Sequence, residues 1–301
     1  MTTFSDFLAA KRTVEDRALN RRVFERFETE LAACTTDDND PIRIVETGAG
    51  TGSMIARLAE WDALPPTVSY RAVDLDGEVI EAARRLLPDR LRAAGYVVDH
   101  TSDGLVARHT RTDGTDHRLE LAFEVEDGFS ISDEADVVIA AALLDLVDLD
   151  SAVGELQHLL RDGGLLYAPI TFNGYTSFTP ADPLDDRIER LYHRHMDEVR
   201  DQPGSSRAGQ QLLDRLPAAG YSVLEAGGAD WIIRPVGGTY PAAESTAIGH
   251  LLATIDNALA DYPPEVLDPA RRTAWIQRRR EQLERGELTL VAHHLDLLAR
   301  L

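Results

Sequence analysis

A short glycine-rich stretch between two apolar segments places the strongest limit on how this chain folds. Residues 42–47 read IRIVET, residues 48–53 read GAGTGS, and apolar side chains at helical spacing continue to residue 61. β-Branched and apolar residues favour a strand, and glycine allows a tight turn with positive φ. The stretch therefore predicts a β-strand, a close turn and an α-helix in succession.

The same alternation of strand and helix continues along the chain. It is typical of a doubly wound α/β fold with a mostly parallel sheet. We expect strands at 67–74, 135–143 and 165–172, a β-hairpin over 105–126, and one or two strands in 221–235. Helices are expected over 3–34, 52–61, 76–95 and 150–164, and the regions 173–204 and 237–286 are expected to be largely helical. The last segment, 287–301, fits either a strand or a helix.

Charge and cysteine content exclude several classes of protein. The 301 residues carry a formal net charge of −21, which argues against nucleic acid as a partner, because phosphate binding needs a basic surface. The single cysteine, Cys34, excludes an internal disulfide and a cysteine-based zinc cluster. Without a secretory pattern or a membrane-spanning apolar run, we expect a cytoplasmic protein. Dispersed acidic residues and one lysine, Lys11, favour a salt-rich cytoplasm, although a GC-rich genome gives the same arginine bias.

The spacing of the glycines separates three kinds of ligand loop. A dinucleotide fingerprint, G-x-G-x-x-G, requires glycine at position 53, where this chain has serine, and a phosphate-binding P-loop requires a lysine that is absent here. The match is to E-x-G-x-G-x-G, with Glu46 two residues before Gly48. In this motif the chain resembles the class I, Rossmann-like S-adenosylmethionine (SAM) methyltransferases. The resemblance covers about residues 42–172 and implies a seven-stranded, mostly parallel α/β sheet.

The resemblance also implies which residues hold the ligand. Glu46 would help to hold the cationic amino group of SAM. Asp74, at the end of the second strand, would bind the hydroxyls of its ribose. Asp127 would accept from the adenine amino group, with Phe129 on the ring; the alternative for Asp127 is a simple turn, and Asp76 is expected to cap a helix instead. The predicted cofactor-binding residues are Glu46, Gly48, Ala49, Gly50, Thr51, Gly52, Asp74, Leu75, Asp127, Gly128, Phe129, Ala140, Ala141 and Leu144.

Catalytic residues are less evident, because a sulfonium methyl donor is already activated and the protein mainly positions the reactants. Asp145 is one candidate base, with helix capping as the alternative. His193 is the other, since Glu189 and Asp197 lie four residues on either side and a carboxylate beside it would raise its pKa; the alternative is a solvated helix face. No metal site is predicted, because His193 and His195 point to different faces.

Two further groups are candidates for contact with the methyl acceptor. Lys11, Arg12 and Arg17 form a basic group on an N-terminal helix that is expected to close over the cofactor. Asn173, Tyr175 and Thr176 follow the fifth strand, where carboxyl ends of strands face the crevice; otherwise they form a turn.

These observations predict one methyltransferase domain that acts on a small molecule. Its parts are an N-terminal helical cap (1–36), a SAM-binding core (37–172), helical lid insertions (173–204 and 237–286) and a closing helix and strands (205–236 and 287–301). A SAM-binding sensor or assembly protein without methyl transfer is the first alternative, and an NAD-dependent oxidoreductase the second. The acceptor, the atom methylated and the oligomeric state stay open.

Overall fold

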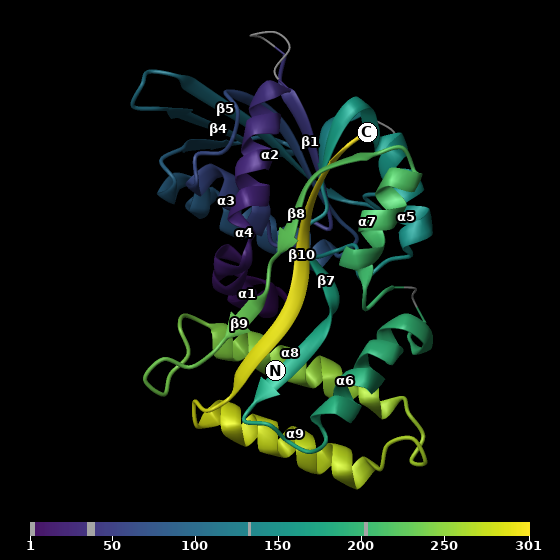
Figure 1. Cartoon of the computed structure of the whole chain (residues 1–301). Coiled ribbons are helices and arrows are strands. Elements are labelled where there is room, and N and C mark those ends of the chain that lie inside the picture. Colours follow the sequence, from purple (N-terminus) through teal and green to yellow (C-terminus); the bar gives the residue numbers. More distant parts are fainter. Residues whose placement is uncertain (1–3, 35–39, 132–133, 202–203) are drawn as a thin grey trace.

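The computed structural model describes residues 4–34, 40–131, 134–201 and 204–301 (Figure 1). Strands and helices alternate in its first half, as the sequence predicts. The strands are β1 Ile42–Thr47, β2 Thr67–Asp74, β3 Val97–His100, β4 Gly104–Thr110, β5 Asp116–Val125, β6 Ala135–Ile139, β7 Leu160–Thr179, β8 Ser222–Gly228, β9 Trp231–Ile233 and β10 Thr289–Arg300. The helices are α1 Phe4–Ala18, α2 Arg21–Ala33, α3 Ser53–Glu60, α4 Gly77–Ala93, α5 Leu149–Leu159, α6 Asp185–Arg194, α7 Ala208–Ala218, α8 Glu244–Ala260 and α9 Pro269–Glu284, with a π-helical segment at His195–Val199.

All described strands belong to one sheet, and its order confirms the predicted fold class. The order is β3-β4-β5-β2-β1-β6-β7-β10-β8, with β9 paired to β10. Strands β5, β2, β1, β6 and β7 are parallel, and β10 runs antiparallel between β7 and β8. The seven strands from β5 to β8 are those of the Rossmann-like methyltransferase fold. The sheet is wider than seven strands. The predicted hairpin adds β4 beside β5, β3 pairs with β4 as the edge strand, and β9 pairs with β10.

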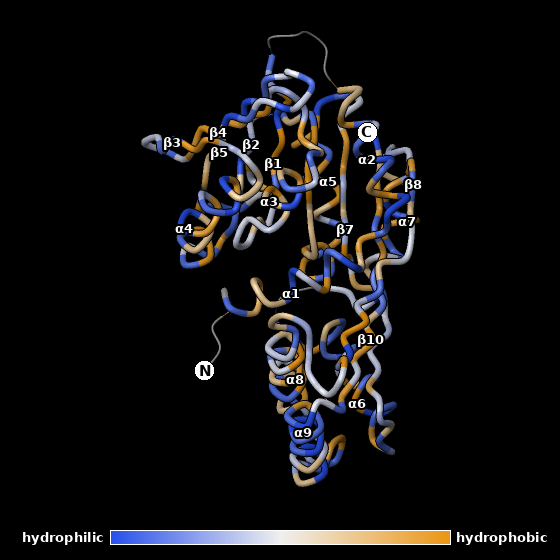
Figure 2. Tube along the Cα trace, turned by 90° about the vertical axis from the view of Figure 1, so that its left-hand side faces the viewer, coloured by the Kyte–Doolittle hydropathy of each residue, from blue (hydrophilic) through white to orange (hydrophobic). Residues whose placement is uncertain are grey.

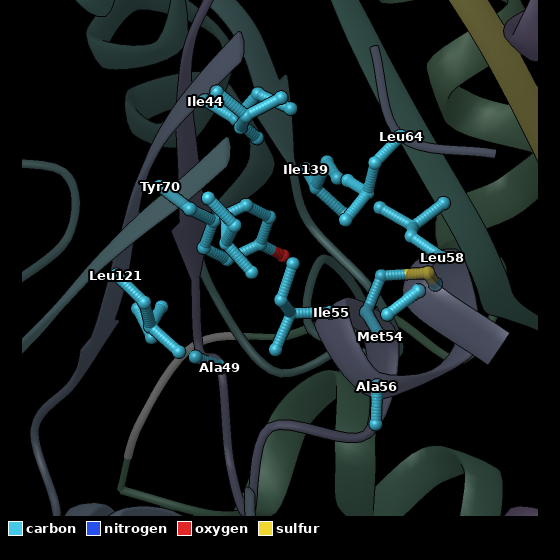
Figure 3. Packing of buried hydrophobic residues seen from close by; sticks show 14 of the residues in the cluster. Ile44, Ala49, Met54, Ile55, Ala56, Leu58, Leu64, Tyr70, Leu121 and Ile139 are labelled. Atoms are coloured by element: carbon cyan, nitrogen blue, oxygen red, sulfur yellow. The ribbon is translucent and has the colours of Figure 1, made fainter. Parts of the chain in front are cut away.

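Helices cover both faces of the parallel strands, because those strands are apolar on both sides. On one face α2, α3 and α4 share a buried cluster with β1 and β2. Figure 3 shows Ile44 and Tyr70 of the sheet facing Ile55 and Met54 of α3. On the other face α5 and α7 pack against β6, β7 and β10. This double cover fixes the strand ends, and with them the loops that bear the predicted site.

Two long strands carry the sheet beyond the parallel core. Strand β7 continues to Thr179, and β10 pairs with it from Thr289 to Arg300. In Figures 1 and 2 both run down into a second region, where α6, α8, α9 and β9 gather. A separate apolar cluster joins this region to α1, with Trp231, Ile255 and Trp275 among its members. The lower ends of β7 and β10 thus serve as the support for a helical region beside the crevice.

Three sequence-based expectations need correction or completion. The segment 173–204 is helical only from Asp185, because residues 173–179 belong to β7, which pairs with β10 at Thr176–Thr179 after an irregularity in register. The helix expected over 150–164 ends at Leu159, where β7 begins. The final segment, left open between strand and helix, is strand β10. Among the described residues we find no helix that combines the length and apolarity needed to cross a membrane.

Candidate functional site

A cavity of about 550 Å³ lies at the carboxyl ends of the parallel strands, where ligands bind in open α/β sheets. Loops that follow β1, β2, β5 and β6 form its floor, and side chains of α1 and α8 form its roof. The predicted cofactor residues that line it are Gly48, Gly50, Asp74, Leu75, Asp127, Gly128, Phe129 and Ala141. A smaller adjoining cavity is lined by Glu46, Ala49 and Thr51. The structure therefore brings together eleven of the fourteen predicted cofactor residues.

The glycine turn between β1 and α3 depends on its backbone conformation. Gly48, Gly50 and Gly52 have φ of 66°, 57° and 73°, a region that disfavours residues with a Cβ. A Cβ on Gly48 would lie 2.9 Å from Cδ1 of Leu143, so it would fill the space at the cavity wall. Gly52 lines neither cavity; it is a glycine because a Cβ there would collide with Leu87 of α4. The structure therefore gives this glycine a packing role, and its contact with a ligand stays a prediction.

Asp74 holds the turn in place from the end of β2. One carboxylate oxygen accepts from the Gly50 N–H at 2.9 Å, and the other accepts from the Asp76 N–H at 3.0 Å. Asp76 caps α4 as expected, with its carboxylate 2.9 Å from the Glu78 nitrogen. The two neighbouring acids thus have different tasks: Asp74 lines the cavity, and Asp76 starts a helix.

Glu46 is a buried carboxyl that forms no direct ion pair with any described lysine or arginine. Its side chain accepts from the Tyr70 hydroxyl at 2.6 Å, and the residue is 2% exposed. Burial raises the pKa of Glu46 to about 8, and the hydrogen bond from Tyr70 offsets only part of that increase. A positively charged group bound beside Glu46 would favour its ionised form. The buried carboxyl therefore suits the ammonium group of an amino-acid ligand.

The loop after β5 closes the far side of the cavity. Asp127 accepts from the Phe129 N–H at 3.0 Å through Oδ1, which is the geometry of an Asx turn. Both residues and Gly128 line the cavity, so the turn and the ligand-binding interpretation hold together. Leu75 lines the same cavity and is 74% exposed. An exposed leucine and an aromatic ring in one cavity provide apolar surface for a flat ring.

The loop after β6 is displaced from the predicted arrangement. Ala141, Ala142 and Leu143 line the cavity, whereas Ala140 and Leu144 are fully buried in the core beneath α5. Ala140 continues the ladder with β7, since its N–H donates to the Tyr167 carbonyl at 2.9 Å. The chain turns at Ala142, whose φ is 51°. Ala140 and Leu144 therefore pack in the core and do not line the cavity, and their contact with a ligand stays a prediction.

The basic group predicted on the N-terminal helix is dispersed. Lys11 lines the cavity of about 550 Å³ and the smaller cavity beside it, and its Nζ lies 2.9 Å from Glu15. Arg12 instead pairs with Glu60, and Arg17 pairs with Glu244 of α8. Arg12 and Arg17 are therefore not at the acceptor site, since they attach α1 to α3 and α8.

A second cavity, of about 570 Å³, adjoins the first and receives few of the predicted acceptor residues. Of these, Thr176 lines it. Asn173 does not; its side-chain oxygen accepts from the Gln210 N–H at 2.7 Å and so fixes the start of α7. Tyr175 is 48% exposed. The two misses follow from β7, whose alternation sends neighbouring side chains to opposite faces.

Of the two candidate bases, the structure favours Asp145 by position. Asp145 lines both cavities, and burial raises its pKa. His193 lines neither; it lies behind Thr176, with Nε2 3.3 Å from the threonine hydroxyl. Burial lowers the pKa of His193 and outweighs the nearby carboxylates, so the expected increase is wrong. The assignment of His193 as a base is therefore not supported by its placement.

Sequence reasoning missed several residues at the junction of the two cavities. Tyr192, Trp231 and His294 line both, and they come from α6, β9 and β10. The adjacent pair His293 and His294 is the sequence feature that could have indicated this junction. It would have done so only once 289–300 had been assigned as a strand, which places His294 at the two cavities. No group of three or more His, Cys, Asp or Glu residues suited to a metal ion occurs within the described ranges.

Comparisons with known proteins give the following similarities. No protein-family model matches the chain. A non-reducing polyketide synthase of Aspergillus niger (azaA) is 31% identical over 136 residues, which cover 38% of this chain and only 5% of the synthase. A Bacillus halodurans protein described as a methyltransferase aligns over 91% of this chain and 97% of its own, with 13% identity and a TM-score of 0.49. A SAM-dependent methyltransferase from Geobacter sulfurreducens, in complex with S-adenosyl-L-homocysteine, aligns over 99% of each chain with 16% identity and a TM-score of 0.45.

Proposed function

We propose that this chain is a SAM-dependent methyltransferase for a small-molecule acceptor. The observation that carries the proposal is a pair of adjoining cavities at the ends of β1 and β2. The glycine turn lines both of them, Glu46 lines the smaller one and Asp74 lines the larger one. Its chemistry fits SAM: a buried carboxyl for the ammonium, a second carboxyl for the ribose, and apolar surface at Leu75 and Phe129 for the adenine. The net charge of −21 supports a small molecule over nucleic acid as the acceptor.

When bound, SAM supplies a methyl group on a sulfonium that is ready for in-line displacement. The chain's own part is positioning and exclusion of water. The roof residues Phe7 and Leu8 of α1 and Leu251 of α8 cover the cavity with apolar side chains. Asp145 stands where the cofactor cavity opens into the second cavity, and its raised pKa suits it to take a proton from an acceptor. We assign it as the general base.

The test is calorimetric titration of S-adenosylhomocysteine into the protein and two matched variants. We expect Asp74→Asn to weaken binding by roughly tenfold or more, because a buried charged hydrogen bond to the ribose is lost. Asp76→Asn is the control: it alters a helix cap two residues away and lines no cavity, so affinity should stay unchanged. Equal affinities in all three proteins, or no binding to a folded protein, would refute the proposal.

Two outcomes would favour the other functional classes. Tight binding of NAD with no binding of S-adenosylhomocysteine would favour an oxidoreductase. Binding of SAM without any product that gains one methyl mass, after incubation with cell extract, would favour a SAM-binding sensor or assembly protein.

A further inference from the structure

The chemistry of the second cavity identifies a class of acceptor. This cavity meets the cofactor cavity along a shared wall, to which Asp145, Tyr192 and Trp231 contribute. Its volume of about 570 Å³ is that of a pocket for a compact organic molecule. A methyl group would pass from the cofactor cavity to the second cavity where the two meet. The reacting atom of the acceptor must therefore lie beside the residues that line both cavities, which we call the shared wall. The inference therefore rests on the proposed methyltransferase function.

The walls of the second cavity disfavour an anionic acceptor. Apolar side chains from six elements line it, among them Phe172, Met196 and Leu251. Of the lysines and arginines in the described part of the chain, Arg200 alone lines it; its guanidinium donates to the Asp145 backbone carbonyl at 3.0 Å, and its Nε is buried without a partner among the described residues. The Asp261 carboxylate is paired with Nε2 of His195 at 2.7 Å, so Asp145 is the carboxylate that adds negative charge at the shared wall. An acceptor with a carboxylate or phosphate at that wall would therefore lose hydration and meet repulsion from Asp145.

Trp231 lines the shared wall, and its indole carries a hydrogen-bond donor that is not used within the described part of the chain. The residue is 7% exposed, and its indole Nε1 is buried with no hydrogen-bond partner among the described residues. A buried donor left unpaired is costly, so a partner supplied by a ligand would be favourable. His294 packs against the indole, with ring centroids 5.0 Å apart, and burial lowers its pKa to about 4. The ring that supports Trp231 is therefore neutral at pH 7.

We propose that the acceptor is an uncharged, largely apolar alcohol or phenol, and that Trp231 and Asp145 hold its hydroxyl group at the shared wall. A hydroxyl oxygen has two lone pairs, so it can accept from the indole N–H with one and attack the methyl group with the other. Its hydrogen is donated to the Asp145 carboxylate. A neutral amine has one lone pair and cannot do both, and a carboxylate has no hydrogen to donate.

The transfer step balances with these groups alone. The acceptor oxygen forms a bond to the methyl carbon while the carbon–sulfur bond breaks, and that electron pair stays on sulfur. The hydroxyl proton moves to Asp145 and is released to solvent after the products leave. The result is a methyl ether, S-adenosylhomocysteine and one proton. Trp231 is a positioning residue for the oxygen, and Asp145 is the catalytic base.

The experiment compares three ligands of one shape, with the protein saturated with S-adenosylhomocysteine. The ligands are 2-naphthol, 2-aminonaphthalene and 2-naphthoate, and their affinities are measured by calorimetry. We expect 2-naphthol to bind at least tenfold more tightly than 2-naphthoate and several-fold more tightly than the amine. Trp231→Phe should weaken the binding of 2-naphthol by about fivefold to tenfold, which is the effect of one hydrogen bond. It should weaken the binding of the amine less, because the nitrogen lone pair of an aromatic amine is delocalised into the ring and accepts poorly.

Two further variants keep the result interpretable. Trp275→Phe removes a buried indole whose Nε1 donates to Asp185 at 2.8 Å and which lines no cavity, so it should cost stability but leave the ligand order unchanged. If Trp231→Phe does not fold, Asp145→Asn tests the inference instead. This variant should bind 2-naphthoate more tightly than the wild type, because it removes a repelling charge.

The possible failures can be distinguished. A folded protein that does not bind S-adenosylhomocysteine would overturn both this inference and the proposed function. Binding of S-adenosylhomocysteine with equal affinity for all three ligands, tighter binding of 2-naphthoate, or no ligand binding would overturn the hydroxyl acceptor alone. A 2-naphthol affinity that is the same in Trp231→Phe would refute the role of the indole.

Discussion

The buried carboxyl of Glu46 makes the stability of this protein depend on pH in a predictable direction. Its pKa is raised from 4.5 to about 8 by burial. The folded state therefore keeps a proton that the unfolded chain releases above about pH 4.5. Because the folded state binds more protons, the contribution of Glu46 to the free energy of unfolding falls as pH rises from 4.5 towards 8. Above about pH 8 both states have released this proton, and the contribution of Glu46 no longer changes with pH.

The variant Glu46→Gln isolates this contribution. The neutral amide keeps an oxygen for the Tyr70 hydroxyl, which lies 2.6 Å from the carboxyl in the wild type. One pKa unit corresponds to about 1.4 kcal/mol. The change from 4.5 to about 8 therefore sets an upper limit of about 5 kcal/mol for the stability that the wild type loses and the variant keeps at pH 9. Relaxation of the site will reduce this value, and the sign is the firm expectation.

Urea denaturation of both proteins across the range pH 5 to 9 measures the difference. The gap between the two free energies of unfolding should widen in favour of the variant as pH rises. Glu120→Gln, at an exposed position of β5, controls for the removal of one negative charge from an acidic chain. Parallel pH profiles for Glu46→Gln and the wild type would refute the reasoning. In the same variant, S-adenosylhomocysteine should bind more weakly, because the ionised partner for its ammonium group is gone.

Two more perturbations test the glycine turn and the roof. Gly52→Ala should lower the free energy of unfolding by about 1–3 kcal/mol in urea denaturation, because φ of 73° and contact with Leu87 both oppose a Cβ. Gly114→Ala, with φ of 88° and open space around it, should cost less than half as much, and an equal loss would contradict the packing argument. Lys11→Arg should keep the fold but lower the affinity for S-adenosylhomocysteine several-fold, as measured by calorimetry. The reason is that the larger guanidinium enters the cavity where Lys11 pairs with Glu15. Unchanged affinity would remove any special role for the lysine.

The order of elements and the cofactor-binding floor could be predicted from the sequence because their signals are local. The turn at 48–53, the helix cap at Asp76 and the acid at the end of β2 each depend on neighbours within a few residues. Strand and helix periodicity gave β1, β2, α3 and α4 to within about two residues, whereas β6 and α5 end four and five residues earlier than expected. The same locality explains the errors after β6, since a positive φ at Ala142 leaves no mark in an alanine-rich run.

The second cavity, in contrast, was decided by tertiary structure. Residues 173–179 are a strand because β10, more than a hundred residues later, pairs with them, and no local pattern contains that partner. Strand β10 carries His294 and also pairs with β9, which carries Trp231, so both side chains line the same cavity as Asp145. The sequence by itself determined which ligand the turn suits, because backbone conformation and residue type are local properties. What the acceptor meets depends on contacts between distant segments, and these exist only once the chain has folded.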